Sequence, residues 1–434
     1  MTATTEAVVA SGEGLAARRA TRDARLRAVI LFGFGALAFY LASQSLNTSA
    51  TFSFWIDEQG GNSAVFQTSV GVLWVAAGLI SWLIAILQLL RGAPFWWRPW
   101  LLILIWPWVA AVLAAALAGK PANLTGMIGG SLEFAVPITL GALAGILSER
   151  SGMLNVALEG KMLIGACVAS VAASVAMLVI GNALVAVLIG IAAAMLVSGS
   201  VGILLAWMGI RHKMDQIIAG TVINIGAVGI TNFLFLRVLS RNTQFNTPPT
   251  IEPWRVPILA DLPVLGPIFF AAKPYVYLMY VMVGVLTYML FRTRWGLRLR
   301  ASGEKPAAAG TVGIDVIAIR YRSLFMAGLI SGLAGSYLSL SVAGNFGMQM
   351  VAGKGFVALA AMIFGAWHPV GALGAALVFG FAGTTQTLLS SLGVADVPPQ
   401  LLNSVPYLVT IIVVAGVVGR VRGPAAAGQP YEQG

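Results

Sequence analysis

The sequence predicts an all-α integral membrane protein, a polytopic helix bundle with about 12 transmembrane helices (range 10–12). Only 9% of its 434 residues are charged and 59% are hydrophobic, whereas a soluble domain carries roughly 25% charged residues. Apolar runs of about 18 residues or more recur along the chain, and each is long enough to cross ~30 Å of hydrocarbon as a helix. Lys and Arg gather in alternate loops, as the positive-inside rule expects of a multi-pass protein.

The chain begins with a polar segment, residues 1–26, that contains Arg18, Arg19, Arg22 and Arg25. It lacks the short apolar core and the small-residue cleavage site of a signal peptide. We therefore expect a disordered cytoplasmic tail.

Twelve apolar runs follow and give the expected spans. They cover 27–44, 69–90, 100–118, 131–147, 153–176, 184–207, 216–237, 275–291, 323–343, 354–367, 369–390 and 402–419. Residues 27–118 are rich in Trp and Leu and are interpreted as an additional N-terminal transmembrane module, followed by a core over 119–420 and a cytoplasmic tail over 421–434. The run 354–367 is the shortest, so a spanning helix and a broken, re-entrant helix are both open for it.

The distribution of basic residues predicts the orientation. With the N-terminus inside, the inner segments hold 19 of the 26 Lys and Arg residues, and seven of these lie in the loop 292–322. We expect a multi-pass protein of the inner or plasma membrane with both termini cytoplasmic. The same scatter argues against a nucleic-acid partner despite the net charge of +11, because no basic domain presents the charges.

Metal binding and disulfide formation have no support in the sequence. Cys167 is the single cysteine and lies in an apolar run, and the two histidines do not form a set with metal-ligand spacing. We expect no metal and no cofactor.

The first polar interruption of the core is 148–161, SERSGMLNVALEGK. Asn155 and Glu159 are four residues apart and would share one face of a helix. A carboxylate inside a span costs roughly 2.5–3.5 kcal/mol on insertion scales, so it needs a partner. It could line a translocation path or lock two helices together, with Asn155 capping a helix start. Lys161 would point away from Glu159.

The second interruption follows the short inner loop 211–214. Gln216, Gly220 and Asn224 form one stripe at helical spacing, and Asp215 precedes them. Glycine allows close approach of another helix. The polar groups could face a pathway or bond a neighbouring helix.

The third is the inner loop 292–322. Pro306 favours a helix start, the alanines after it propagate the helix, and Gly310 and Gly313 would end it. The loop is either a docking element for a soluble partner or an ordinary basic loop.

The glycine-rich stretch from Gly344-Asn345-Phe346 to Gly353-Lys354-Gly355-Phe356 lies at the expected outer edge of the membrane. It could form a gate, a binding mouth or a simple turn between spans.

A phosphate-binding P-loop is absent from the sequence. None of the three Gly-Lys pairs has a glycine five residues earlier, and none is followed by Ser or Thr. If ATP drives this protein, another chain must hydrolyse it.

These segments together resemble one family. Four segments resemble, in order, motifs of the ABC importer permeases for branched-chain amino acids, ribose and related sugars. They are ITLGALAGILSERSGMLNVALEGKMLIGA, HKMDQIIAGTVIN, GLRLRASGEKPAAAGTVGID and GNFGMQMVAGKGFVALAAMIFGAWHPVGALGAALVFG. Within that group the nucleoside and simple-sugar permeases are most similar. The resemblance extends from about Gly130 to the tail GRVRGPAAAGQPY.

The resemblance implies a type II-like importer core and a role for each segment. The substrate pathway would include Asn155, Glu159, Asp215, Gln216, Asn224, Asn345 and Phe346. Residues 302–314 would couple to an ATPase through Gly303, Glu304, Pro306, Ala307, Ala308, Gly313 and Ile314. Lys161 departs from the family pattern, where an apolar residue is expected.

The resemblance also implies the partners. They are a cytoplasmic ABC ATPase, a second related permease in a heterodimer, an extracytoplasmic substrate-binding lipoprotein and membrane lipid. Nucleosides are the first expected substrate and simple sugars the second.

Two other classes are weighed against this function. An ion-coupled secondary transporter of small polar solutes would need intramembrane ionisable residues, of which Glu159 is the main candidate, and often an inverted repeat, which is not evident. A membrane enzyme would need a nucleophile–base pair, a metal cluster or paired carboxylates, and the sequence offers none.

Overall fold

The computed structural model describes residues 22, 25–55, 63–91, 98–119, 121–391 and 423–431. These residues belong to two compact units. The first ends at Thr125 and includes residues 388–391, and the second comprises residues 126–387 and 423–431.

The first unit combines apolar helices with a small sheet. Its helices are Arg25–Gln44, α2 (Val70–Arg91) and α3 (Arg98–Ala116). The strands β1 (Ser49–Trp55), β2 (Ser63–Ser69) and β3 (Pro121–Asn123) form a sheet in the order β2-β1-β3. β1 pairs antiparallel with β2 and parallel with β3. Hydropathy did not predict these strands, because they lie in a loop between apolar runs.

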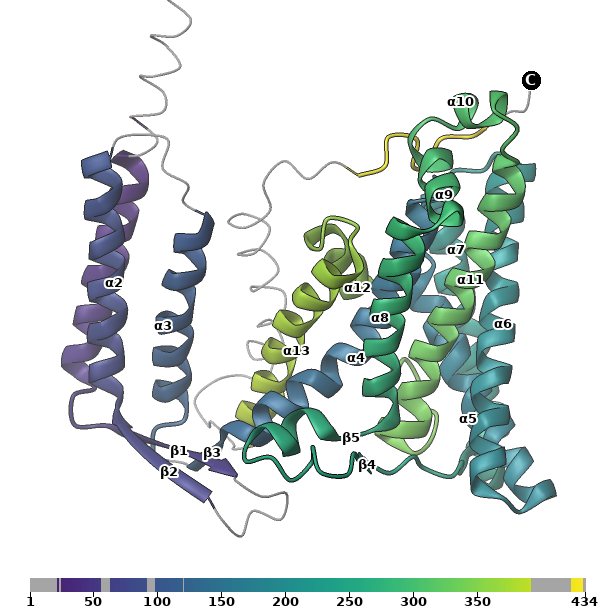
Figure 1. Cartoon of the computed structure of the whole chain (residues 1–434). Helices are drawn as coiled ribbons and strands as arrows, with labels where there is room; N and C mark the ends of the chain where they lie inside the picture. Colours follow the sequence, from purple (N-terminus) through teal and green to yellow (C-terminus); the bar gives the residue numbers. More distant parts are fainter. Residues whose placement is uncertain are drawn as a thin grey trace, which may run out of the picture. The chain divides into compact units, whose positions relative to one another are not determined.

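The second unit is a helix bundle (Figure 1). Its helices are α4 (Leu124–Glu149), α5 (Leu158–Ile180), α6 (Ala183–Arg211), α7 (Gln216–Leu234), α8 (Pro274–Arg292), α9 (Arg294–Glu304), α10 (Pro306–Thr311), α11 (Val316–Tyr337), α12 (Lys354–Phe364) and α13 (Pro369–Ser391). π-Helical turns extend α7 to Leu239 and α11 to Ala343, and a two-residue pair, β4 (Trp254–Arg255) with β5 (Ala271–Ala272), closes the long loop before α8.

The prediction of an all-α, multi-pass membrane protein is confirmed. Within the described ranges, nine helices are long and apolar enough to cross a membrane, and two shorter apolar helices cover Pro107–Ala116 and Lys354–Phe364. The expected span 402–419 lies outside the described residues.

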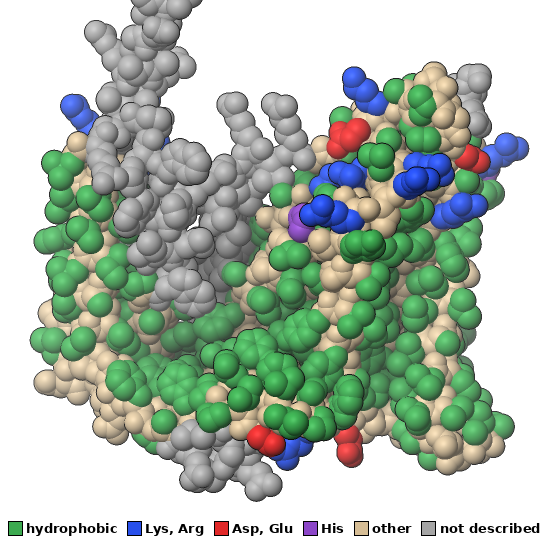
Figure 2. All heavy atoms as spheres, viewed as in Figure 1, with side chains coloured by type: hydrophobic (Ala, Val, Ile, Leu, Met, Phe, Trp, Pro, Cys, Tyr) green, Lys and Arg blue, Asp and Glu red, His purple; other side chains and the backbone are tan. Residues whose placement is uncertain are grey.

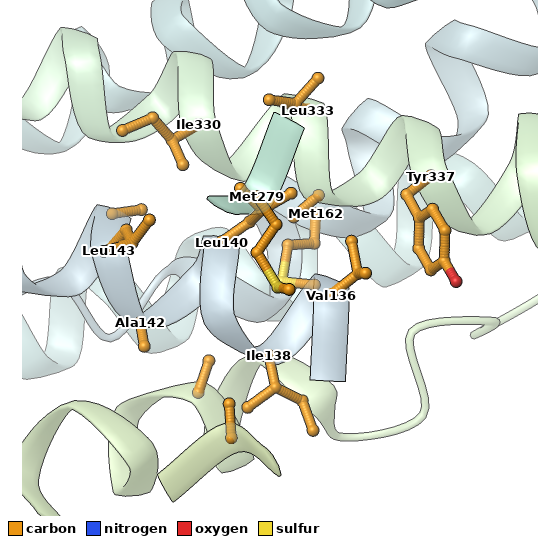
Figure 3. Packing of buried hydrophobic residues seen from close by; sticks show 14 of the residues in the cluster. Val136, Ile138, Leu140, Ala142, Leu143, Met162, Met279, Ile330, Leu333 and Tyr337 are labelled. Atoms are coloured by element: carbon orange, nitrogen blue, oxygen red, sulfur yellow. The ribbon is translucent and has the colours of Figure 1, made fainter. Parts of the chain in front are cut away.

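The core of the second unit is apolar and closely packed. Figure 3 shows Val136, Ile138 and Leu140 of α4 among side chains of α5, α8 and α11. Glycine allows α5 and α11 to touch, because a Cβ at Gly335 would collide with the Met162 carbonyl oxygen.

The structure of residues 354–367 fits the broken-helix alternative better than a helix that spans the membrane. α12 has 11 residues, so it is about 16 Å long and covers roughly half of a hydrocarbon core. Residues 344–353 lead into it without α-helix, and the chain reverses at residues 365–368 into α13, with Ala366 and Trp367 at positive φ. The chain is therefore non-helical on both sides of α12, at residues 344–353 and at residues 365–368.

Candidate functional site

Asn155 and Glu159 do not share a helical face, which corrects the spacing argument. α5 begins at Leu158, and Asn155 lies in the preceding turn. Asn155 does not cap the helix either. Its side-chain oxygen accepts a hydrogen bond from the Lys161 ammonium, and both side chains are fully buried. A buried ammonium needs such a partner.

Glu159 instead binds the start of the half-helix α12. One carboxylate oxygen accepts from the Gly353 amide at 2.8 Å and the other from the Gly355 amide at 2.7 Å. These amides belong to the positive end of a helix, which has no intrahelical acceptors for them. The Glu159 side chain is partly buried between α5 and the start of α12.

The α7 stripe faces the turn that precedes α5. The Gln216 side chain accepts from the Leu154 amide at 2.7 Å, and Asn224 accepts from the Gly160 amide at 2.8 Å. Asn224 also donates to the Val156 carbonyl at 2.9 Å. These bonds hold the non-helical turn in place, so the stripe binds a neighbouring segment.

Asp215 lies apart from this cluster. It is exposed and caps α7 by accepting from the amides of Ile217 and Ile218 at 2.8 and 3.1 Å. Capping by an aspartate at this position is a common helix start.

The glycine-rich stretch contains one exposed and one buried candidate. Asn345 is exposed, and Phe346 is buried against Phe235 with ring centroids 6.2 Å apart. The backbone of Phe346 is held from both sides by Asn246, which accepts from its amide at 2.8 Å and donates to its carbonyl at 2.9 Å.

Asn246 is a residue that the sequence analysis missed. It comes from the long loop before α8 and also accepts a hydrogen bond from Ser170 of α5 at 2.7 Å. A polar residue in a polar loop gives no signal by itself, and the partner lies 100 positions away. Backbone strain accompanies this anchor, because Gln349 and Ala352 adopt positive φ.

The loop 292–322 contains two helices, where one was expected. α10 begins at Pro306 as predicted, but Gly310 lies inside it and only Gly313, at φ +80°, follows its end. The preceding helix α9 was not predicted. Ser302 and Gly303 are buried in α9, and the Ser302 hydroxyl donates to the Ser151 carbonyl at 3.1 Å. Glu304, Lys305, Ala307 and Ala308 are exposed.

A basic surface surrounds these two helices. Figure 2 shows Lys and Arg side chains gathered at the end of the second unit that carries α9 and α10. Nearby, Arg150 donates to the Trp367 carbonyl at 3.1 and 3.2 Å and ties the turn between α12 and α13 to the end of α4. Burial lowers the pKa of Arg150, and burial followed by repulsion from Arg150 lowers the pKa of His368.

No group of three or more His, Cys, Asp or Glu side chains suited to a metal ion occurs among the residues that the structure describes.

A family model described as "Branched-chain amino acid transport system / permease component" matches residues 127–414. The chain is 38% identical over 308 residues to the guanosine ABC transporter permease protein NupQ of Bacillus subtilis, covering 70% of this chain and 95% of that protein. It is 36% identical to the nucleoside ABC transporter permease protein NupC of Lactococcus lactis, with 70% and 96% covered.

A third relative is the putative glucose ABC transporter permease protein TsgC13 of Haloferax volcanii, 30% identical over 71% of this chain and 98% of that protein. No solved structure matches the chain.

Proposed function

Since this chain belongs to the branched-chain amino acid transport system permease family and is the membrane-spanning permease subunit of an ABC importer, we propose that the solute it imports is a nucleoside. One observation carries the choice of substrate. Two relatives named for guanosine or nucleoside transport match about two thirds of this chain and nearly the whole of their own length. The region matched by the family model, residues 127–414, contains all seven pathway candidates.

Uptake of labelled guanosine tests this proposal. A strain that lacks the gene should lose saturable guanosine uptake and regain it on complementation. Simple sugars are the second candidate, because a relative named as a putative glucose permease matches at 30% identity. Excess unlabelled adenosine should compete with guanosine, and excess glucose should not. The reverse pattern would transfer the proposal to sugars.

The permease family implies an ATPase and a substrate-binding protein as partners. We propose further that the second permease is a related chain in a heterodimer and that the binding protein is an extracytoplasmic lipoprotein. The chain has no ATPase site of its own in this proposal and acts without metal or cofactor. The missing P-loop supports a separate ATPase.

The proposed pathway follows the broken helix. Glu159 at the start of α12 and Phe346 at the outer part of residues 344–353 mark its two ends, with exposed Asn345 nearest the entrance. Asn155, Gln216 and Asn224 would not contact the solute. Their hydrogen bonds would hold the turn that positions Glu159. Asp215 would contribute only at the cytoplasmic end of α7. Non-helical backbone at membrane depth is typical of transport pathways.

The proposed ATPase contact is the loop of α9 and α10, residues 292–322. Ala307 and Ala308 are exposed on α10, beside exposed Glu304 and half-buried Pro306. Gly303 fixes the loop to the bundle, since a Cβ there would collide with the Arg150 carbonyl. Gly313 and Ile314 lead the chain back into α11. A stiff contact of this kind is what ATP-driven motion requires.

Both termini are proposed to be cytoplasmic, and residues 27–118 are proposed to be an added module. The count of basic residues supports the orientation. The family match begins at residue 127, and the first compact unit ends at Thr125, which supports a separate module.

A further inference from the structure

The segment 423–431, GPAAAGQPY, lies beyond the region matched by the family and yet folds back onto the second unit (Figure 1, yellow). It reaches α9 by two hydrogen bonds. The Ala426 amide donates to the Gly303 carbonyl at 2.9 Å, and the Ala425 amide donates to the Glu304 carboxylate at 3.3 Å. The Ala426 side chain is buried at this contact.

The same segment binds the turn that positions Glu159. The Gly428 amide donates to the Gly152 carbonyl at 3.1 Å, and Gly428 adopts φ +78° against Leu154. Glycine is the residue that reaches this conformation without strain. The segment therefore connects the coupling loop with the turn before α5.

A buried arginine fixes the end of the segment. Arg320 of α11 donates from one guanidinium nitrogen to the Gln429 carbonyl at 3.0 Å, and its guanidinium lies 5.9 Å from the centre of the Tyr431 ring. Its side chain is almost wholly buried. Burying a guanidinium is unfavourable unless it is bonded, so the hydrogen bond to Gln429 and the contact with the Tyr431 ring offset part of this cost and hold the end of the segment.

Segment 423–431 also completes a shallow, open groove with the coupling loop, which we name the coupling cavity. It has a volume of about 390 Å³ and is lined by Ala301, Glu304, Lys305, Ala308, Ala309, Val312, Ile314 and Ala425. Its lining is largely apolar, and Val312 is 74% exposed. Figure 2 shows Lys and Arg side chains at the end of the second unit that carries α10, so the apolar lining of this cavity belongs to an otherwise charged surface.

We propose that segment 423–431 is part of the ATPase-docking surface and that the coupling cavity receives an apolar side chain of the ATPase. The inference rests on the proposed coupling role of α10, because the cavity continues that surface without a break. Two arguments identify the ATPase as the source of the side chain that fills the cavity. The cavity adjoins the proposed coupling surface of α10, and the positive-inside count puts it on the side of the cytoplasmic ATPase. Force applied at Ala425 would reach Glu159 through Gly428 and Gly152.

The test compares two arginine substitutions in one segment. Ala425→Arg puts a long cation into the coupling cavity and leaves the Ala425 amide in place. Gln429→Arg adds the same side chain four residues later. The side chain of residue 429 is exposed and does not line the cavity, and the backbone carbonyl of this residue can still accept the hydrogen bond from Arg320. Binding of the purified ATPase subunit of the same transporter is measured on the full-length permease in nanodiscs, together with membrane abundance.

We expect Ala425→Arg to weaken ATPase binding about tenfold or more, as a charge placed in an apolar interface does, and Gln429→Arg to stay within about twofold. Equal binding by both variants, or equal weakening by both, would overturn the assignment. Deleting residues 423–434 should weaken binding at least as much as Ala425→Arg, at normal abundance, and native affinity of the deletion would also overturn it. Failure of the unaltered permease to bind the ATPase would instead contradict the proposed function.

Discussion

At the scale of single residues, Glu159 is the most informative position. Its carboxylate accepts two amides at the start of α12, so Glu159→Gln replaces one acceptor oxygen by a donor and leaves one buried N–H without a partner. The loss is about 1–3 kcal/mol. We expect guanosine uptake to fall about tenfold or more while membrane abundance falls less than twofold.

The control for Glu159 is Glu252→Gln, the same chemical change at an exposed carboxylate in the long loop before α8. Uptake by that variant should equal uptake by the unaltered protein. Full activity of Glu159→Gln would show that the bond to α12 is dispensable for transport.

Gly355 tests the packing of α12 on α5. A Cβ at this glycine would lie 2.6 Å from the backbone of Glu159, so Gly355→Ala must displace the half-helix. We expect a destabilisation of about 1–3 kcal/mol, the usual effect of overpacking, seen as a lower melting temperature in detergent.

Gly374→Ala in α13 is the matched control, because a Cβ there meets nothing within 4 Å. Equal melting temperatures for the two alanine variants would contradict the close contact between α12 and Glu159.

The residue scale also shows where sequence reasoning stops. The types of residue that matter were visible, because a carboxylate in an apolar run is conspicuous. Their partners were not. Asn155 and Glu159 are separated by a helix start at Leu158, and the amides that Glu159 binds lie 194 and 196 positions away. Helical periodicity reports neighbours within one helix and is silent on such contacts.

At the scale of elements, α10 carries the coupling proposal. Ala308→Arg adds bulk and charge to an exposed position that lines the coupling cavity. We expect an inserted, stable protein whose affinity for the ATPase falls about tenfold or more and whose uptake falls with it. Pull-down of the ATPase and guanosine uptake measure the two effects.

Ala308→Ser keeps the size of the side chain and serves as the control for Ala308→Arg. Both its affinity and its uptake should remain within about twofold of the unaltered protein. Normal binding and transport by Ala308→Arg would refute the coupling role of α10.

Elements were predicted well where hydropathy alone determines them and poorly where polar contacts do. The long apolar spans were found, because a membrane requires every backbone group to be satisfied within a helix. α9 was missed, since its buried residues Gly296, Leu299, Ser302 and Gly303 are too few and too small to give an apolar run. The non-helical stretch before Lys354 fell between the expected spans 323–343 and 354–367, but hydropathy could not show that its backbone binds Glu159 and Asn246.

At the scale of the whole molecule, the orientation can be measured directly. Cys167 is the single cysteine and is buried, so Cys167→Ser gives a background for site-specific labelling. An impermeant maleimide should label Asp261→Cys in intact cells and Lys305→Cys only after the membrane is opened. Both positions are exposed. The opposite pattern would invert the proposed orientation and remove the coupling loop from the cytoplasm.

The central claim is that this chain forms the path for a nucleoside and that a separate ATPase drives the movement. The most direct measurement is accumulation of labelled guanosine in proteoliposomes that contain the permease pair, the ATPase and the binding protein. We expect accumulation that requires ATP and stops when either the ATPase or this chain is omitted, with no effect of dissipating ion gradients. Accumulation by this chain without the ATPase, driven by a proton or sodium gradient, would contradict the account and establish a secondary transporter.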